Sequence, residues 1–195
     1  NAIVGTVSGT SISFGTAVVF NSANTDDPSG VYDTTNQKVV IAYRDNGNSQ
    51  YGTAIVGTVS GTSISFGTAV VFDSSNTEKY SCIYDPIIQK VVISYADKTG
   101  NKGKSIIGTV SGTSISFGTA VVFNSGDIDF TSSVYDPDTG KVVIAYKDNA
   151  NSNYGTSVVL STTSLVTNLT SENYIGIAAE AISNTATGKI TVVGG

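Results

Sequence analysis

The chain has 195 residues and a net charge of −5 at pH 7, and only 13% of its residues are charged. It contains no histidine and a single cysteine, Cys82, so it lacks the usual general base and cannot form an internal disulfide. The sequence has no basic face and its apolar runs are short, so we expect neither a nucleic-acid partner nor insertion into a membrane.

A sixteen-residue string, GTVSGTSISFGTAVVF, occurs unchanged three times, at residues 5–20, 57–72 and 108–123. The copies are 52 and 51 residues apart. An internal repeat of this length is typical of propellers, solenoids and arrays. The chain starts at Asn1, inside a repeat and without a charged and apolar leader, so we expect a processed product or a part of a longer protein, with no signal peptide.

Residues 1–20 carry only the second half of a repeat, and residues 29–73 carry a complete one. The predicted strands of the complete repeat, named A to D, are 29–33, 38–43, 51–60 and 63–72. They are rich in β-branched residues, and the turns between them are rich in Asp, Asn, Gly and Ser. Gly67 predicts a bulge or bend inside strand D. The same pattern follows at 79–124 and at 131–167.

The tail supplies what residues 1–20 lack. Residues 184–194 (NTATGKITVVG) align with 136–146 (DPDTGKVVIAY), so residues 175–195 are predicted to provide strands A and B. The sequence therefore predicts one all-β domain over 1–195, a closed four-bladed β-propeller. Its blades are approximately 29–73, 79–124, 131–167, and a composite of 175–195 plus 1–20. A segment of a longer array, or of a polymerising chain, is the alternative.

Strand A would line the narrow centre of such a ring, where small residues are required. The aligned positions are all small: Gly30, Cys82, Ser133 and Gly176. We therefore expect Cys82 to be a buried, unreactive thiol. The tyrosines of strands A and B are expected to pack between blades; they are Tyr32, Tyr84, Tyr135, Tyr43, Tyr95 and Tyr146. The aspartates that open the B-to-C turns, Asp45, Asp97 and Asp148, are expected to hold those turns through backbone N–H groups.

The D-to-A connections differ between repeats, whereas the strands around them are copied. We therefore expect these connections to determine binding specificity. The alternative is that their sequences have drifted without a function. One aligned position is always acidic: Asp26, Glu78, Asp129 and Glu172. If these carboxylates form a ring at the channel mouth, the ring would suit Ca²⁺. The other interpretation is that they are solvated charges too far apart to act together. The aromatic residues of these connections, Tyr80, Phe130 and Tyr174, are expected to be exposed and are candidates for stacking on a sugar ring. The predicted ligand-binding residues are Asp26, Asp27, Glu78, Tyr80, Asp129, Phe130, Glu172 and Tyr174.

The block YDTTNQKVVIAYRDNGNSQYGTAIVGTVSGTSISFGTAVVF and its copies resemble the repetitive regions of phage tail-fibre and related virion proteins from aquatic environments. Residues 168–195 (NLTSENYIGIAAEAISNTATGKITVVGG) resemble the segment that leads into a C-terminal module in those proteins. The resemblance implies an extracellular or virion location, and it brings no catalytic motif.

These observations together predict a non-enzymatic structural or binding module, a phage fibre component that contacts cell-surface glycans. Its expected partners are such a glycan or other fibre subunits, and no cofactor is expected apart from Ca²⁺. One alternative is a subunit of an extracellular filament that assembles by exchanging strands between chains. Another is a glycoside hydrolase that uses two of the four aligned carboxylates, because such enzymes need a pair about 5–10 Å apart.

Overall fold

A computed structural model of the chain describes residues 1–161, 177–178 and 190–191. Contacts within the chain divide it into two units, Asn1–Thr163 and Ser164–Gly195. Every regular element in the described residues is a β-strand, and all strand pairs are antiparallel, which confirms the predicted all-β class. The described residues contain no helix long and apolar enough to cross a membrane.

The strands of the first unit, in chain order, are β1 (Gly5–Ser8), β2 (Ser11–Phe14), β3 (Thr25–Asp33), β4 (Lys38–Asp45), β5 (Tyr51–Ser60), β6 (Ser63–Phe66), β7 (Val70–Asp85), β8 (Lys90–Asp97), β9 (Lys102–Ser111), β10 (Ser114–Phe117), β11 (Val121–Asn124), β12 (Ile128–Asp136), β13 (Lys141–Asp148) and β14 (Tyr154–Ser161). The second unit contains β15 (Ile177–Ala178) and β16 (Ile190–Thr191).

The first two repeats each have the predicted four antiparallel strands, and the third contributes the three-stranded sheet β12–β13–β14 in the described residues. In the first repeat β3, β4 and β5 are strands A, B and C, while β6 and the beginning of β7 together form strand D along β5. The break between β6 and β7 falls at Gly67, whose N–H donates to the Val56 carbonyl at 2.9 Å. The predicted bend is therefore confirmed. Strand β7 then continues without interruption into strand A of the next repeat, where it pairs with β8.

Gly67 also allows two repeats to approach closely. A Cβ at Gly67 would overlap the carbonyl oxygen of Thr113, in the tight turn of the following repeat. Gly15 stands in the same relation to Thr62 one repeat earlier. Glycine is required here because the backbone of the neighbouring turn occupies the space that a side chain would need.

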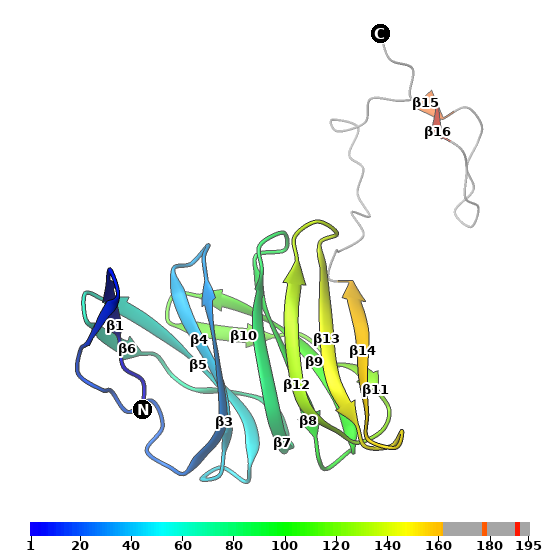
Figure 1. Ribbon diagram of the computed structural model, residues 1–195, viewed down its shortest axis with the longest axis horizontal. Coiled ribbons are helices and arrows are strands. Elements are labelled where there is room, and N and C mark those ends of the chain that lie inside the picture. The colour runs from blue at the N-terminus through cyan, green and yellow to red at the C-terminus, as the bar shows by residue number, and fades with distance from the viewer. Residues whose placement is uncertain (162–176, 179–189, 192–195) are drawn as a thin grey trace. The chain divides into compact units, whose positions relative to one another are not determined.

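The inner strands β3, β7 and β12 lie side by side (Figure 1) and are joined by hydrogen bonds from backbone N–H groups to serine hydroxyls. The Cys82 N–H donates to the Ser29 hydroxyl at 3.1 Å, and one repeat later the Ser133 N–H donates to the Ser81 hydroxyl at 2.8 Å. Each strand A is thus bonded to the strand A of the preceding repeat, which sets the spacing and register between successive sheets.

The hydrophobic core lies between successive sheets, and one aromatic pair recurs in it. A phenylalanine from strand D packs against a tyrosine from strand B of the next repeat, with ring centroids 5.2–5.3 Å apart. The pairs are Phe20–Tyr43, Phe72–Tyr95 and Phe123–Tyr146. The predicted role of the strand-B tyrosines in packing between repeats is confirmed. Tyr32, by contrast, is 51% exposed.

Residues 1–20 form the predicted C–D hairpin. Strand β1 pairs with β2, and a further bridge between Ala2 and Val18 matches the pairing of Ala54 with Val70 in the next copy. In the second unit, β15 pairs with β16 in the order expected of strands A and B. The rest of the composite blade, including Gly176, lies outside the described residues. The closed four-bladed ring is not confirmed, because the sheets of the described residues do not close on one another.

Candidate functional site

The D-to-A connections and the B-to-C turns meet at one edge of the sheets, which we call the loop edge. A backbone hydrogen bond joins the two segments at the same place in each repeat. Asn46 N–H donates to the Asn24 carbonyl at 3.0 Å, and Lys98 N–H donates to the Asn76 carbonyl at 2.9 Å. The third repeat has the equivalent bond from Asn149. The two sets of connections therefore lie together at one edge in all three repeats.

The aspartates that open the B-to-C turns hold them, as predicted. The carboxylate of Asp45 accepts the Gly47 N–H at 3.0 Å, that of Asp97 accepts the Gly100 N–H at 2.8 Å, and Asp148 accepts the Ala150 N–H at 3.1 Å. A short acidic side chain that binds backbone donors two or three residues on fixes a tight turn. These aspartates are therefore structural.

Strand A carries a bulge at the loop edge in all three repeats. The register shifts between Asp26 and Ser29, and at the equivalent places in β7 and β12. The residue in each bulge has a left-handed backbone, although none is glycine: Asp27 (φ 49°), Lys79 (φ 58°) and Phe130 (φ 53°). Non-glycine residues rarely adopt this conformation, so the surrounding sheet must impose it. The bulge presents a different side chain in each repeat from one fixed backbone position.

A run of alternating charges crosses the loop edge from repeat to repeat, and we call it the charge ladder. Its members, in order, are Asp26, Arg44, Glu78, Lys98, Asp129 and Lys147. The first two cations each bridge carboxylates of successive repeats, whereas the last contacts a carboxylate of its own repeat. The ladder is therefore both a neutralised charge cluster and a set of links between sheets.

The first half of the ladder is centred on Arg44. Its Nη2 lies 2.6 Å from Asp26 Oδ2 and its Nη1 lies 3.2 Å from Glu78 Oε2. Asn46 Nδ2 also donates to Asp26 Oδ2, at 2.8 Å. Hydrogen bonds from Asn46 and Arg44 hold the pKa of the Asp26 carboxyl below its usual value. Asp26 is therefore ionised at neutral pH.

The second half is centred on Lys98, whose Nζ lies 3.4 Å from Glu78 Oε1, 2.7 Å from Asp127 Oδ1 and 3.0 Å from Asp129 Oδ1. Partial burial opposes ionisation of Asp129, but hydrogen bonds from Asn149 and Lys98 outweigh it and lower the pKa of this carboxyl. Burial likewise opposes the charge on Lys98, yet its acidic partners raise the pKa of its ammonium group.

The structure brings together three of the four aligned carboxylates, with cationic side chains between them. Glu172, the fourth, lies outside the described residues. Among the residues that are described, no group of three or more acidic or cysteine side chains is arranged to hold a metal ion. Arg44 and Lys98 occupy the positions from which a cation would neutralise these carboxylates. Ca²⁺ binding stays a prediction from the sequence.

The aromatic candidates have different outcomes. The prediction that Tyr80 is exposed is wrong, because Tyr80 is only 7% exposed and packs against Phe72 and Tyr95. Its hydroxyl lies 2.6 Å from Thr77 Oγ1 and donates to the Thr77 carbonyl at 2.9 Å. The bulge alone does not bury this position, because Pro28 follows the equivalent bulge residue of the first repeat and is exposed. Phe130 is 69% exposed, as expected of a contact residue. Tyr174 lies outside the described residues.

Asp27 has a role that the sequence did not indicate. Its Oδ2 accepts hydrogen bonds from both the backbone N–H and the Nζ of Lys79, each at 3.2 Å, so it links two bulges. The sequence pattern also did not indicate that Arg44 and Lys98 pair with the aligned carboxylates, because these two cations are not at equivalent positions of the repeat. A comparison of charge signs between the D-to-A connections and the B-to-C turns would have revealed the complementarity.

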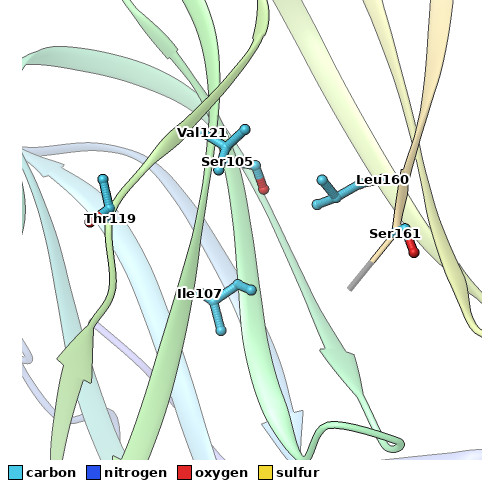
Figure 2. Close-up of a pocket in the computed structure, with 6 residues that line it drawn as sticks. All are labelled: Ser105, Ile107, Thr119, Val121, Leu160 and Ser161. Carbon is cyan, nitrogen blue, oxygen red and sulfur yellow. The ribbon is translucent and has the colours of Figure 1, made fainter. Parts of the chain in front are cut away.

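One pocket lies elsewhere, between β9 and β14, and Figure 2 shows the side chains that line it. Its lining residues are Ser105, Ile107, Thr119, Val121, Leu160 and Ser161. Its volume of about 110 Å³ is well below the roughly 300 Å³ at which small-molecule sites begin. None of these side chains is ionisable, so the pocket offers no acid–base chemistry.

A comparison of the sequence with models of known protein families finds no match, and a comparison with curated proteins finds none either.

Proposed function

We propose that this chain is a non-enzymatic binding and structural module of an extracellular or virion surface, in the manner of a phage fibre component. In this proposal the copied repeats form a durable scaffold, and the loop edge contacts cell-surface glycans. The observation that carries the proposal is the recurrent bulge, which holds three chemically different side chains at one backbone position. A fixed scaffold with variable side chains on one edge is how binding specificity is commonly built.

The chemistry of the loop edge suits a carbohydrate. Phe130 offers an exposed aromatic face, and the adjacent Asp129 carboxylate has acceptor capacity beyond its bonds to Lys98 and Asn149. Sites for polar ligands combine an aromatic surface with a few fixed polar groups in this way. The ladder also holds the side chains in place, so less conformational entropy is lost on binding.

The hydrolase alternative has less support. A glycosidase needs one carboxylic acid whose pKa is raised so that it can protonate the leaving group. The pKa values of Asp26 and Asp129 are lowered instead. Neither residue suits the role of general acid.

A glycan array probed with the labelled chain tests the proposal. We expect binding without turnover, and a loss of about tenfold or more in affinity on Phe130→Ala, because an exposed aromatic contact is a typical binding hot spot. Ile87→Ala is the matched control, since Ile87 is 59% exposed in the A-to-B turn at the opposite edge. Absence of binding to every glycan, or equal binding by the Phe130 variant, would contradict the proposal. Turnover of a bound glycan would favour the hydrolase.

A further inference from the structure

We propose that a few side chains at the end of each C–D hairpin form a pairing code, which determines the sheet on which that hairpin docks. The code combines the residue after the sixteen-residue string with the residues that it meets on strands B and C of the next repeat. It goes beyond the proposed function, because it concerns how the repeats find their order. Its members, interface by interface, are Asn21 with Asp45 and Thr53, Asp73 with Asp97 and Lys104, and Asn124 with Asp148 and Thr156.

The string itself gives the hairpins no identity of their own. Its copies at 5–20, 57–72 and 108–123 have one sequence, and the last phenylalanine of each packs on the strand-B tyrosine of the next repeat. The aromatic contact is therefore the same at all three docking interfaces. Chains of similar repeats are prone to misassembly between repeats and to exchange of elements between copies. Whatever distinguishes one docking interface from another must lie outside the string.

The first and third interfaces use an asparagine and an aspartate. Asn21 follows the first copy of the string, and its Nδ2 donates to Asp45 Oδ1 at 3.1 Å. Asn124 follows the third copy, and its Nδ2 donates to Asp148 Oδ1 at 3.5 Å. The strand-C residue that pairs with the strand-B tyrosine is a threonine at both interfaces, Thr53 and Thr156.

The middle interface differs at two of these three positions, and both differences introduce a charge. Asp73 replaces the asparagine and Lys104 replaces the threonine. Lys104 Nζ lies 3.0 Å from Asp73 Oδ2 and 2.7 Å from Asp97 Oδ2. The Tyr95 hydroxyl also donates to Asp73 Oδ2, at 2.9 Å. The lysine thus lies between two carboxylates that would otherwise repel each other.

These charges are shielded from water, so a mismatch at this position is costly. The side chains of Asp73 and Asp97 are 10% and 5% exposed, and that of Lys104 is 19% exposed. Burial opposes ionisation of Asp73, but hydrogen bonds from Lys104 and Tyr95 outweigh it and lower the pKa of this carboxyl. Removal of one partner from a buried ion pair leaves an uncompensated charge, which is strongly destabilising.

Mispairing of the middle hairpin is therefore opposed by charge. If this hairpin docked on the sheet that receives the first or the third, Asp73 would face Asp45 or Asp148 with a threonine in place of the lysine. If another hairpin took its place, an asparagine would replace Asp73 and Lys104 would lose one of its two carboxylates. Specific pairing of similar surfaces commonly combines a favourable correct contact with unpaired charges in the wrong one.

A second contact, two positions further along, separates the first hairpin from the third. A Cβ added to Gly47 would lie 2.4 Å from the Ala23 Cβ, so the first interface has room for one methyl group. The third interface has the reverse order, because a Cβ added to Gly126 would lie 2.5 Å from the Ala150 Cβ. The first hairpin on the third receiving sheet would place Ala23 against Ala150, with two methyl groups in the space for one.

A double-mutant cycle tests whether the charged set and the neutral set are alternatives. Asp73→Asn with Lys104→Thr gives the middle interface the residues of the other two. Lys104→Thr alone should lower the urea midpoint by roughly 1 M, because it leaves two buried carboxylates facing each other. The double variant should recover at least half of that loss, because an asparagine can donate to Asp97 as Asn21 donates to Asp45. No recovery in the double variant would contradict the code.

Refolding is the measurement that a merely stabilising ion pair would not move. The wild-type chain and the double variant are refolded from urea under reducing conditions, at low and high protein concentration, and analysed by size exclusion. We expect the wild type to regain its starting elution profile at both concentrations. At high concentration the double variant should form at least twofold more misassembled oligomer, because its hairpins no longer differ in charge.

A matched control moves the charged set instead of erasing it. Asn21→Asp with Thr53→Lys, added to the double variant, gives the set to the first interface and should restore the refolding yield. Equal refolding by the wild type and the double variant would overturn the pairing code. A moved set that folds stably without restoring the yield would overturn it too. Neither result bears on glycan binding, which the Phe130 experiment decides separately.

Discussion

Residues 2–20 and residues 54–72 have the same sequence and form the same hairpin, yet they bury very different amounts of it. Ile12 is 55% exposed and its copy Ile64 is 7% exposed, although the strand register around them is identical. The hairpin conformation is therefore determined locally, by the tight turn and the β-branched strands. Its burial is determined by the sheets on either side.

The largest expected effect is at the glycine that lets two repeats meet. Gly67→Ala should destabilise the chain by about 3 kcal/mol or more, because the new Cβ would overlap the Thr113 carbonyl and the two sheets would have to separate. Gly118→Ala, in the third copy of the same string, should cost less. Its nearest described neighbour, the Ile107 carbonyl oxygen, would lie 4.0 Å from the added Cβ. Urea unfolding of both variants measures the difference, and equal costs would contradict it.

Much of the repeat was predictable because its signals are local. The turns depend on Asp45 and its equivalents, and the bend depends on Gly67, so each could be recognised from a few residues. The continuation of β7 from strand D into the next strand A was not predictable, nor was the burial of Tyr80. The bulge at Lys79 explains neither, because the equivalent bulge at Phe130 follows a break between β11 and β12, and Pro28, in the position of Tyr80, is exposed. The burial of Tyr80 comes from its contacts with Phe72 and Tyr95, which are distant in the repeat pattern. The charge ladder joins residues that are 34 positions apart in the chain at Arg44–Glu78, and no single segment of sequence reveals it.

A smaller effect should separate inner from outer copies of one apolar residue. Ile115 is 3% exposed, so Ile115→Ala should cost about 2–4 kcal/mol in unfolding free energy. Ile12→Ala removes the same methyl groups from an exposed position and should cost under about 1 kcal/mol in dilute solution. The two variants share the same local sequence, so they control for strand propensity. A large cost for Ile12→Ala in dilute monomer would mean that this face is covered within the chain.

The ladder offers the same contrast between an inner and a terminal group. Lys98 contacts three carboxylates and its side chain is 19% exposed, so Lys98→Ala should cost about 1–2 kcal/mol. Lys147 lies 3.8 Å from Asp129 and its side chain is 36% exposed, so Lys147→Ala should cost under about 0.5 kcal/mol. Thermal melts at low and high salt check this prediction. A cost for Lys98→Ala that does not shrink in high salt would point to packing instead of charge.

The smallest effect at neutral pH is expected at Cys82, where the repeats already provide the comparison. The equivalent residue in the third repeat is Ser133. Cys82 has the Ser29 hydroxyl and the Ala42 backbone as hydrogen-bonding neighbours, so a serine hydroxyl would find partners there. Cys82→Ser should therefore cost less than about 1 kcal/mol in unfolding free energy.

Burial raises the pKa of the Cys82 thiol from 9.0 to about 11. Below pH 9 the thiol is protonated in both the folded and the unfolded chain, so it costs no stability. Between pH 9 and 11 the thiol ionises more readily in the unfolded chain, and the free energy of unfolding falls. The wild-type chain should therefore lose more unfolding free energy than Cys82→Ser between pH 8.5 and 11. Parallel denaturant titrations isolate the thiol, because the buried tyrosines titrate in both proteins. Identical pH profiles would show that the thiol titrates as it does in the unfolded chain.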